Sequence, residues 1–204
     1  MMRTLIVTAV EAEAAAVRAA SGDLEVYPVG VGIAAAAAGT AALLARGGYD
    51  RVISAGIAGG FAGRADIGDV VVCTRTVAAE LGAASPDGFL PIESLGFGTS
   101  WFAAEKLALG AAGPLPGLAV RFGEILTLQT VTGTAAGARE LAARHPDALA
   151  EAMEGFGVAT AAHLAGVRFG ELRTISNLIG PRDTSTWRFG VAFAALTTAF
   201  KELL

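Results

Sequence analysis

The segment Arg51-Val52-Ile53-Ser54-Ala55-Gly56-Ile57-Ala58-Gly59-Gly60 joins a short apolar run to a cluster of glycines. We expect a buried strand over residues 51–55 and a tight glycine turn over residues 56–60, because glycine tolerates the positive φ angles of such turns. An alanine-rich stretch over residues 34–46 precedes this segment and is expected to form a helix. A helix followed by a buried strand and a turn is typical of an α/β domain.

The same alternation continues along the whole chain. Short apolar runs bounded by glycine predict strands buried on both faces, and helical stretches separate them. The expected strands cover residues 3–10, 25–31, 70–74, 118–121, 125–128 and 169–176, and the further helices cover residues 13–20, 136–144, 154–165 and 188–203. Residues 80–101 are expected to form a long loop, and residues 113–117 a turn. We predict one α/β domain over residues 1–204, in which helices pack on a largely buried sheet.

Charge and cysteine content exclude several classes of function. The 204 residues include 15 Lys and Arg against 19 Asp and Glu, which gives a net charge of −4. Because nucleic-acid binding needs a basic face, no nucleic-acid partner is expected. Cys73 is the single cysteine and lies in an apolar run, so an internal disulfide framework is excluded and a reducing compartment is indicated.

The expected location is the cytoplasm, without a membrane anchor. Glu11 and Glu13 interrupt the first apolar stretch, so the start of the chain does not match a signal peptide. Residues 26–45 carry no charge and, at about 20 residues, could cross a bilayer. Pro28 and three glycines interrupt them, which favours a strand, a turn and a buried helix over a membrane span.

Candidate site residues fall where a predicted strand ends or a helix begins, which is where open α/β sheets bind ligands. They are Glu11 with Glu13, the glycines of residues 56–60, Met153 with Glu154, and Ser176 with Asn177. Each has an ordinary structural explanation when taken alone. A glutamate in the first turn of a helix complements the helix dipole, and Ser and Asn often cap turns.

Taken together, four motifs resemble a known family. Thr8-Ala9-Val10-Glu11-Ala12-Glu13, residues 54–60, Ala152-Met153-Glu154-Gly155 and Arg173-Thr174-Ile175-Ser176-Asn177 occur in the order found in the methylthioadenosine/adenosylhomocysteine nucleosidase branch of the nucleoside phosphorylase superfamily. The resemblance spans nearly the whole chain. It implies a three-layer sandwich with a central mixed sheet flanked by helices. It also implies a purine nucleoside as substrate, a homo-oligomer as the assembly and no cofactor. No metal site is expected, since His145 and His163 lie far apart without ligand spacing.

The resemblance also implies a role for each site residue. Glu13 is similar to the carboxylate that positions and deprotonates the attacking water. Met153 would lie beneath the ribose, and Glu154 would accept hydrogen bonds from its hydroxyl groups. Backbone near Gly59 and Val131 would hold the base. Asn177, next to Ser176, would contact N7 and the substituent on carbon 6.

Two departures from relatives in the superfamily indicate the substrate and the nucleophile. The adenine-cleaving relatives carry aspartate at the position of Asn177, whereas an asparagine NH₂ group suits a carbonyl oxygen and so predicts a 6-oxopurine. The first turn carries Glu11 and Glu13 instead of the glycine and arginine that hold phosphate in phosphorylases, which predicts water as the nucleophile.

The segments around residues 81–98 and 176–187 are similar to those of the futalosine hydrolase family. This resemblance implies that futalosine is hydrolysed to hypoxanthine and dehypoxanthine futalosine in the alternative route to menaquinone. Futalosine carries a carboxylated aromatic group on its 5′ side. Arg182 and Arg188 are the candidate partners for that carboxylate, although both could be ordinary surface arginines.

Three other functions remain open from the sequence. One is a methylthioadenosine/adenosylhomocysteine nucleosidase or another purine nucleosidase. Another is a nicotinamide-dependent dehydrogenase, since Gly30-Val31-Gly32-Ile33-Ala34-Ala35 matches a G-x-G-x-x-A fingerprint, but the acidic residue expected after the next strand is missing. The last is a protein that binds nucleosides without catalysis, against which the presence of Glu13 argues.

Overall fold

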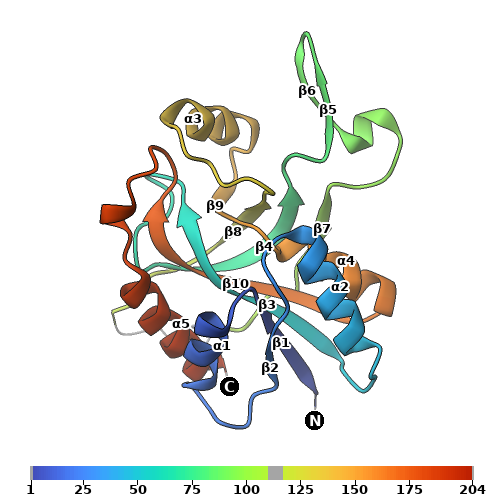
Figure 1. The fold of residues 1–204 in the computed structure, drawn as a ribbon, viewed down its shortest axis with the longest axis vertical. Coiled ribbons are helices and arrows are strands. Elements are labelled where there is room, and N and C mark those ends of the chain that lie inside the picture. The colour runs from blue at the N-terminus through green and yellow to red at the C-terminus, as the bar shows by residue number, and fades with distance from the viewer. Residues whose placement is uncertain (1, 110–116, 204) are drawn as a thin grey trace.

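The computed structural model describes residues 2–109 and 117–203, which form three layers (Figure 1). Helices α1 (Glu11–Arg18) and α5 (Phe189–Leu203) cover one face of a central sheet. Helices α2 (Ile33–Leu44) and α4 (Gly155–Ala165) pack together on the other face. A further helix, α3 (Ala135–Arg144), lies apart from these pairs. The predicted α/β sandwich with a central mixed sheet is confirmed.

The sheet has eight strands in the order β10-β4-β8-β9-β3-β1-β2, with β7 paired to β4. Strand β10 also pairs with β3, so a closed ring forms from β3, β9, β8, β4 and β10. Strands β1 and β2 extend the sheet from β3, outside this ring. The ring therefore brings the end of β3 close to the ends of β9 and β10. The strands are β1 (Thr4–Thr8), β2 (Val26–Pro28), β3 (Arg51–Gly60), β4 (Val70–Ala78), β7 (Trp101–Ala103), β8 (Val120–Thr127), β9 (Ala148–Ala152) and β10 (Arg168–Leu178).

Alternation along the strands supplies both helical layers with apolar contacts. Ile53 belongs to the core that includes Phe200 of α5, whereas Val52 belongs to the core that includes Val158 of α4. Successive strand residues point to opposite faces, so a strand covered on both faces is largely apolar. This explains why β1 and the first half of β4 appear in the sequence as continuous apolar runs.

The predicted glycine turn over residues 56–60 is wrong, because β3 continues to Gly60. Its backbone pairs with β10 along this length, and none of its glycines has a positive φ angle. Glycine is needed here for close packing. A Cβ atom on Gly60 would lie 2.8 Å from the carbonyl oxygen of Ala65, and one on Gly56 would lie 2.9 Å from Cδ of Glu13.

Several other boundaries also differ from those expected. Residues 118–128 contain one strand, β8, where two were predicted, and β9 was not predicted. The expected loop over residues 80–101 contains a hairpin of β5 (Gly82–Ser85) and β6 (Gly88–Pro91), followed by the 3₁₀ helix η1 (Ile92–Leu95). This hairpin projects from the body of the protein (Figure 1). Residues 113–116 of the predicted turn lie outside the described residues.

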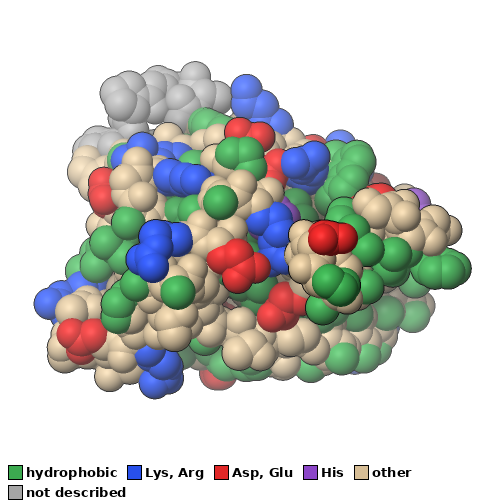
Figure 2. All heavy atoms as spheres, turned by 90° about the horizontal axis from the view of Figure 1, so that it is seen from above, with side chains coloured by type: hydrophobic (Ala, Val, Ile, Leu, Met, Phe, Trp, Pro, Cys, Tyr) green, Lys and Arg blue, Asp and Glu red, His purple; other side chains and the backbone are tan. Residues whose placement is uncertain are grey.

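Residues 26–45, which were long enough to suggest a membrane span, form the short strand β2 and the 12-residue helix α2. Within the described parts of the chain, no helix combines the length and apolar character needed to cross a membrane. The face shown in Figure 2 carries Lys and Arg side chains interspersed with Asp and Glu.

Candidate active site

The site begins where β3 changes its strand partner. Along one edge, β3 pairs with β1 as far as Ser54 and with β9 from Gly59 onward. The segment between these pairings contains Ile57, whose backbone N–H donates to Oε1 of Glu13 over 2.9 Å. A side chain therefore takes the place of a neighbouring strand at this point, which fixes a carboxylate against the centre of the sheet.

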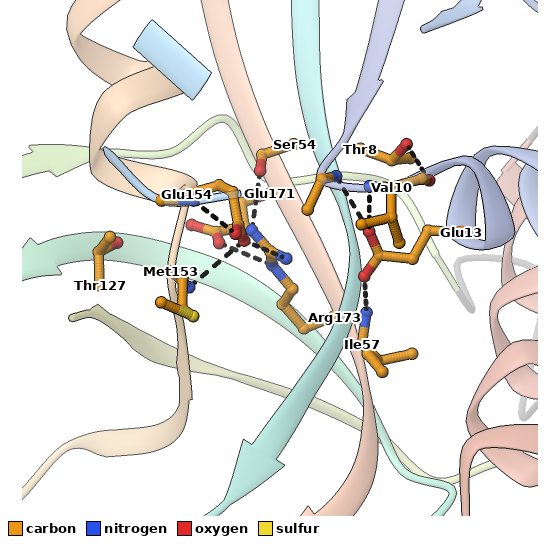
Figure 3. A network of polar contacts seen from close by, with 12 residues as sticks. Thr8, Val10, Glu13, Ser54, Ile57, Thr127, Met153, Glu154, Glu171 and Arg173 are labelled. Carbon is orange, nitrogen blue, oxygen red and sulfur yellow. Dashed lines mark hydrogen bonds and ion pairs between the residues drawn. The ribbon is translucent and has the colours of Figure 1, made fainter. Parts of the chain in front are cut away.

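Glu13 is held by backbone on both sides. It is the third residue of α1, and its Oε2 accepts from the N–H groups of Ala9 (2.9 Å) and Val10 (3.2 Å) at the end of β1 (Figure 3). The residue is only 4% exposed. Burial raises the pKa of Glu13, although the charge of Arg173 and the N–H of Ile57 oppose that rise. A fixed carboxylate with a raised pKa is suited to accept a proton.

Arg173 stands at the centre of the polar network behind the site, and sequence reasoning gave it no role. Its Nη1 lies 3.2 Å from Glu154 Oε2, its Nε donates to Glu171 Oε1 over 3.0 Å, and its Nη2 donates to Ser54 Oγ over 3.0 Å. Figure 3 shows the guanidinium between Glu154 and Glu171 on one side and Glu13 on the other. Burial lowers the pKa of Arg173, but attraction to these three carboxylates outweighs it and raises the pKa overall.

An arginine two residues after a glutamate in a predicted buried strand was the sequence signal for this network. β10 is buried from residue 169 to residue 176, and Arg173 is 1% exposed. A buried charge requires partners of opposite sign, so Arg173 in such a strand indicates carboxylates nearby. Glu171 lies two residues earlier on the same strand and is therefore one expected partner, whereas the sequence does not show that Glu154 is the other.

Glu154 joins the start of α4 to the start of α2. Its Oε1 accepts from the N–H of Gly32 over 3.2 Å, and its Oε2 accepts from the N–H of Met153 over 3.3 Å. The next N–H along the chain, that of Ile33, donates to Oε1 of Gln129. Two N–H groups at the G-x-G-x-x-A segment are thus bonded to side chains, whereas a dinucleotide site would present such groups to pyrophosphate.

A cavity of about 230 Å³ opens in front of this network. All eight residues selected from the sequence line it, namely Glu13, Gly59, Val131, Met153, Glu154, Ser176, Asn177 and Arg182. Residues that were not selected also line it, including Thr132, Glu151, Trp187 and Phe189. Neither His145 nor His163 is among the lining residues.

Ser176 and Asn177 both lie within β10, which continues to Leu178, two residues beyond the predicted end at residue 176. The Ser176 hydroxyl lies 2.8 Å from Asn177 Oδ1 and 3.2 Å from the carbonyl oxygen of Ala58. A hydroxyl has one hydrogen to donate, and the shorter contact orients the Asn177 amide with its oxygen toward Ser176. Asn177 Nδ2 then donates to the carbonyl oxygen of Leu178 over 3.1 Å and keeps a second hydrogen.

The two candidate arginines on the 5′ side have different environments. Arg182 lines the cavity, and its Cζ lies 5.5 Å from the centre of the Trp187 ring. Arg188 is not among the lining residues, and its Nη1 donates to the carbonyl oxygens of Ser185 and Trp187. Arg182 is therefore the better placed of the two to meet a ligand.

A model of the phosphorylase superfamily matches residues 3–204. A futalosine hydrolase of Streptomyces coelicolor is 52% identical over 185 residues, which cover 88% of this chain and 77% of that protein. A futalosine hydrolase of Acidothermus cellulolyticus is 48% identical over an alignment that covers 99% of this chain and 90% of that protein.

Among solved structures, the 5′-methylthioadenosine/S-adenosylhomocysteine nucleosidase of Neisseria meningitidis, in complex with methylthio-immucillin-A, matches with a TM-score of 0.84. The match covers 100% of this chain and 98% of that chain at 22% identity, which shows a shared fold. The chain belongs to the phosphorylase superfamily and, within it, to the futalosine hydrolase family.

Proposed function

We propose that this protein hydrolyses the N-glycosidic bond of futalosine, releasing hypoxanthine and dehypoxanthine futalosine in menaquinone biosynthesis. The observation that carries the proposal is that the Glu13 carboxylate and the Asn177 amide line the same cavity. The high identity to two futalosine hydrolases supports the choice of substrate. An adenine-releasing nucleosidase is the alternative, and the absence of an acid at position 177 argues against it.

In the proposed reaction, Glu13 takes a proton from the attacking water. An ionised carboxylate has about four acceptor positions. Backbone N–H groups occupy three of them on Glu13, which leaves one for water. Oxygen bonds to C1′ as the C1′–N9 bond breaks, and the bonding electrons pass to the purine. Glu13 and Glu154 stabilise the positive charge that develops on the ribose, and Glu154 accepts from its hydroxyl groups.

The purine end of the cavity would stabilise the leaving group. We assign to Asn177 Nδ2 a hydrogen bond to N7 or O6, where negative charge accumulates as the bond breaks. Gly59 and Val131 would contact the base, with Ser176 fixing the Asn177 amide. Met153 would pack beneath the ribose. Arg182, together with Trp187, would meet the carboxylated aromatic group on the 5′ side.

The surroundings of Glu13 favour water over phosphate as nucleophile. A phosphate dianion there would meet the carboxylates of Glu13 and Glu154. Arg173 is already paired with Glu154 and Glu171, and Arg18 on the same helix is paired with Glu11 at 2.6 Å. The test is product analysis with and without phosphate. The proposal expects the same rate in both buffers and no sugar 1-phosphate, whereas a phosphate-dependent rate would make the protein a phosphorylase.

The cytoplasmic location and the homo-oligomer stay predictions. Phe97 and Leu164 are 80% and 81% exposed, so both are accessible to another subunit. Light scattering measures the assembly directly, and a mass equal to one chain would contradict the prediction. Cell fractionation tests the location.

A further inference from the structure

Glu151 is a buried carboxylate in the cavity wall that the reaction above does not use. It lies on β9, pairs through its backbone with Gly59, and is 4% exposed. Its Oε1 accepts from the N–H of Thr132 over 2.8 Å. Among the described residues nothing bonds to its Oε2, although that atom is buried. An unpaired buried carboxylate oxygen is costly, so a donor from a ligand would stabilise it.

Glu151 and Asn177 flank the same point of the cavity floor. A Cβ atom on Gly59 would lie 3.5 Å from Cγ of Glu151 and 3.4 Å from Nδ2 of Asn177. All three residues line the cavity. An acceptor without a partner therefore lies beside an NH₂ donor at the end of the cavity assigned to the base.

This pair of groups complements one edge of a 6-oxopurine. In hypoxanthine the oxygen on carbon 6 accepts a hydrogen bond, and the adjacent N1 carries a hydrogen that it can donate. In adenine the pattern is reversed, because the amino group donates and N1 has a lone pair. A carboxylate can accept from N1–H but repels a lone pair. We propose that Glu151 is a specificity-determining residue that accepts a hydrogen bond from N1–H of a 6-oxopurine, an inference that rests on the proposed function.

The bond to Thr132 makes the Glu151→Gln variant a sharp test. The N–H of Thr132 requires an acceptor, so the glutamine oxygen should occupy the Oε1 position. Its NH₂ group would then occupy the place of Oε2, and a donor would replace an acceptor there. Such a donor suits the N1 lone pair of adenine. The variant should therefore lose affinity for hypoxanthine and gain affinity for adenine, and a misfolded protein would not show that gain.

Calorimetry with the free bases measures this preference without turnover. The wild type should bind hypoxanthine at least about tenfold more tightly than adenine or 1-methylhypoxanthine, which lacks the N1 hydrogen. Glu151→Ala should weaken hypoxanthine binding by about tenfold or more and leave 1-methylhypoxanthine little changed. Glu140→Gln, which removes an exposed carboxylate on α3, should behave like the wild type.

Two results would overturn the inference. One is a wild type that binds 1-methylhypoxanthine as tightly as hypoxanthine, and the other is a Glu151→Gln variant that keeps the full preference for hypoxanthine over adenine. Hydrolysis of futalosine by the wild type is measured separately. If no hypoxanthine is released, the proposed function fails even where the preference in base binding follows Glu151.

Discussion

Glu154 and Arg173 form an ion pair with 3.2 Å between Oε2 and Nη1, and both side chains are almost completely buried. The pair joins the start of α4 to β10, and Arg173 connects it to Glu171 and Ser54. The carboxylate assigned to the ribose is thus fixed by a charge inside the sheet. Because buried partners cannot be replaced by water, loss of either charge should affect the whole site.

Removing the charge of Arg173 should destabilise the protein. Arg173→Met leaves Glu154 and Glu171 buried without their cation, which should lower the free energy of unfolding by about 3–5 kcal/mol. Urea denaturation measures the change. Arg168→Met is the matched control on the same strand, because the Arg168 side chain is 55% exposed and its ion pair with Glu105 should contribute about 0–1 kcal/mol. Equal effects of the two substitutions would contradict this account of Arg173.

Glu13→Gln should lower turnover by about 10²- to 10⁴-fold, because an amide cannot take the proton of the water. Hypoxanthine binding should persist, since the base is assigned to the other end of the cavity. Glu11→Gln on the same helix is the control. Glu11 is exposed and pairs with Arg18, so its variant should keep wild-type turnover. Normal turnover in Glu13→Gln would remove Glu13 from the mechanism and leave nucleoside binding without catalysis as an explanation.

The pH dependence of kcat/KM should reflect the raised pKa of Glu13. The base must be ionised, so activity should fall as pH decreases through a value above the ordinary 4.5 of a glutamate. Stability should change in the opposite direction. The folded state binds this proton more tightly than the unfolded state, so the stabilising contribution is present at low pH and is lost as pH rises through the folded pKa.

Thermal unfolding from pH 4 to pH 8 measures this second effect. The melting temperature of Glu13→Gln relative to the wild type should increase as pH rises, because the variant has no carboxylate to ionise at this position. A difference that does not depend on pH, or one that decreases, would contradict the raised pKa.

Gly56→Ala should impair catalysis by displacing Glu13. A Cβ atom there would lie 2.9 Å from Glu13 Cδ and closer still to Oε1. A shift of about 1 Å in a catalytic group can cost about 100-fold in rate. Gly22→Ala is the control, because a Cβ at Gly22 meets nothing within 4 Å. Steady-state kinetics on both variants decide the matter, and an unchanged rate for Gly56→Ala would show that the position of Glu13 is not limiting.

Much of the fold could be predicted from the local sequence. Strand β3 begins with a largely apolar run, and α2 is rich in alanine, which favours a helix. The end of β3 could not be predicted in this way. A cluster of glycines is compatible both with a turn and with close packing, and the pairing with β10 that decides between them joins residues more than 100 positions apart. Strand β9 is short and rich in alanine, which gives a weak strand signal.

The candidate site was predictable to the extent that its residues belong to motifs. Glu13, Glu154 and Asn177 follow from the family resemblance, and the structure places them around one cavity. Arg173 and Glu151 were missed because their importance depends on burial and on contacts across the sheet. Glu151 gave only a faint signal, a single carboxylate in an otherwise apolar stretch two residues before Met153.

Competition between two nucleosides tests the central claim most directly, because it measures both the chemistry and the choice of base. Wild-type protein is incubated with equal concentrations of futalosine and methylthioadenosine in phosphate-free buffer, and the free bases are separated by chromatography. Hypoxanthine should form first and in large excess, with adenine release slower by about tenfold or more. Faster release of adenine would contradict the assignment of Asn177 to a 6-oxopurine, and release of neither base would contradict the proposed hydrolysis.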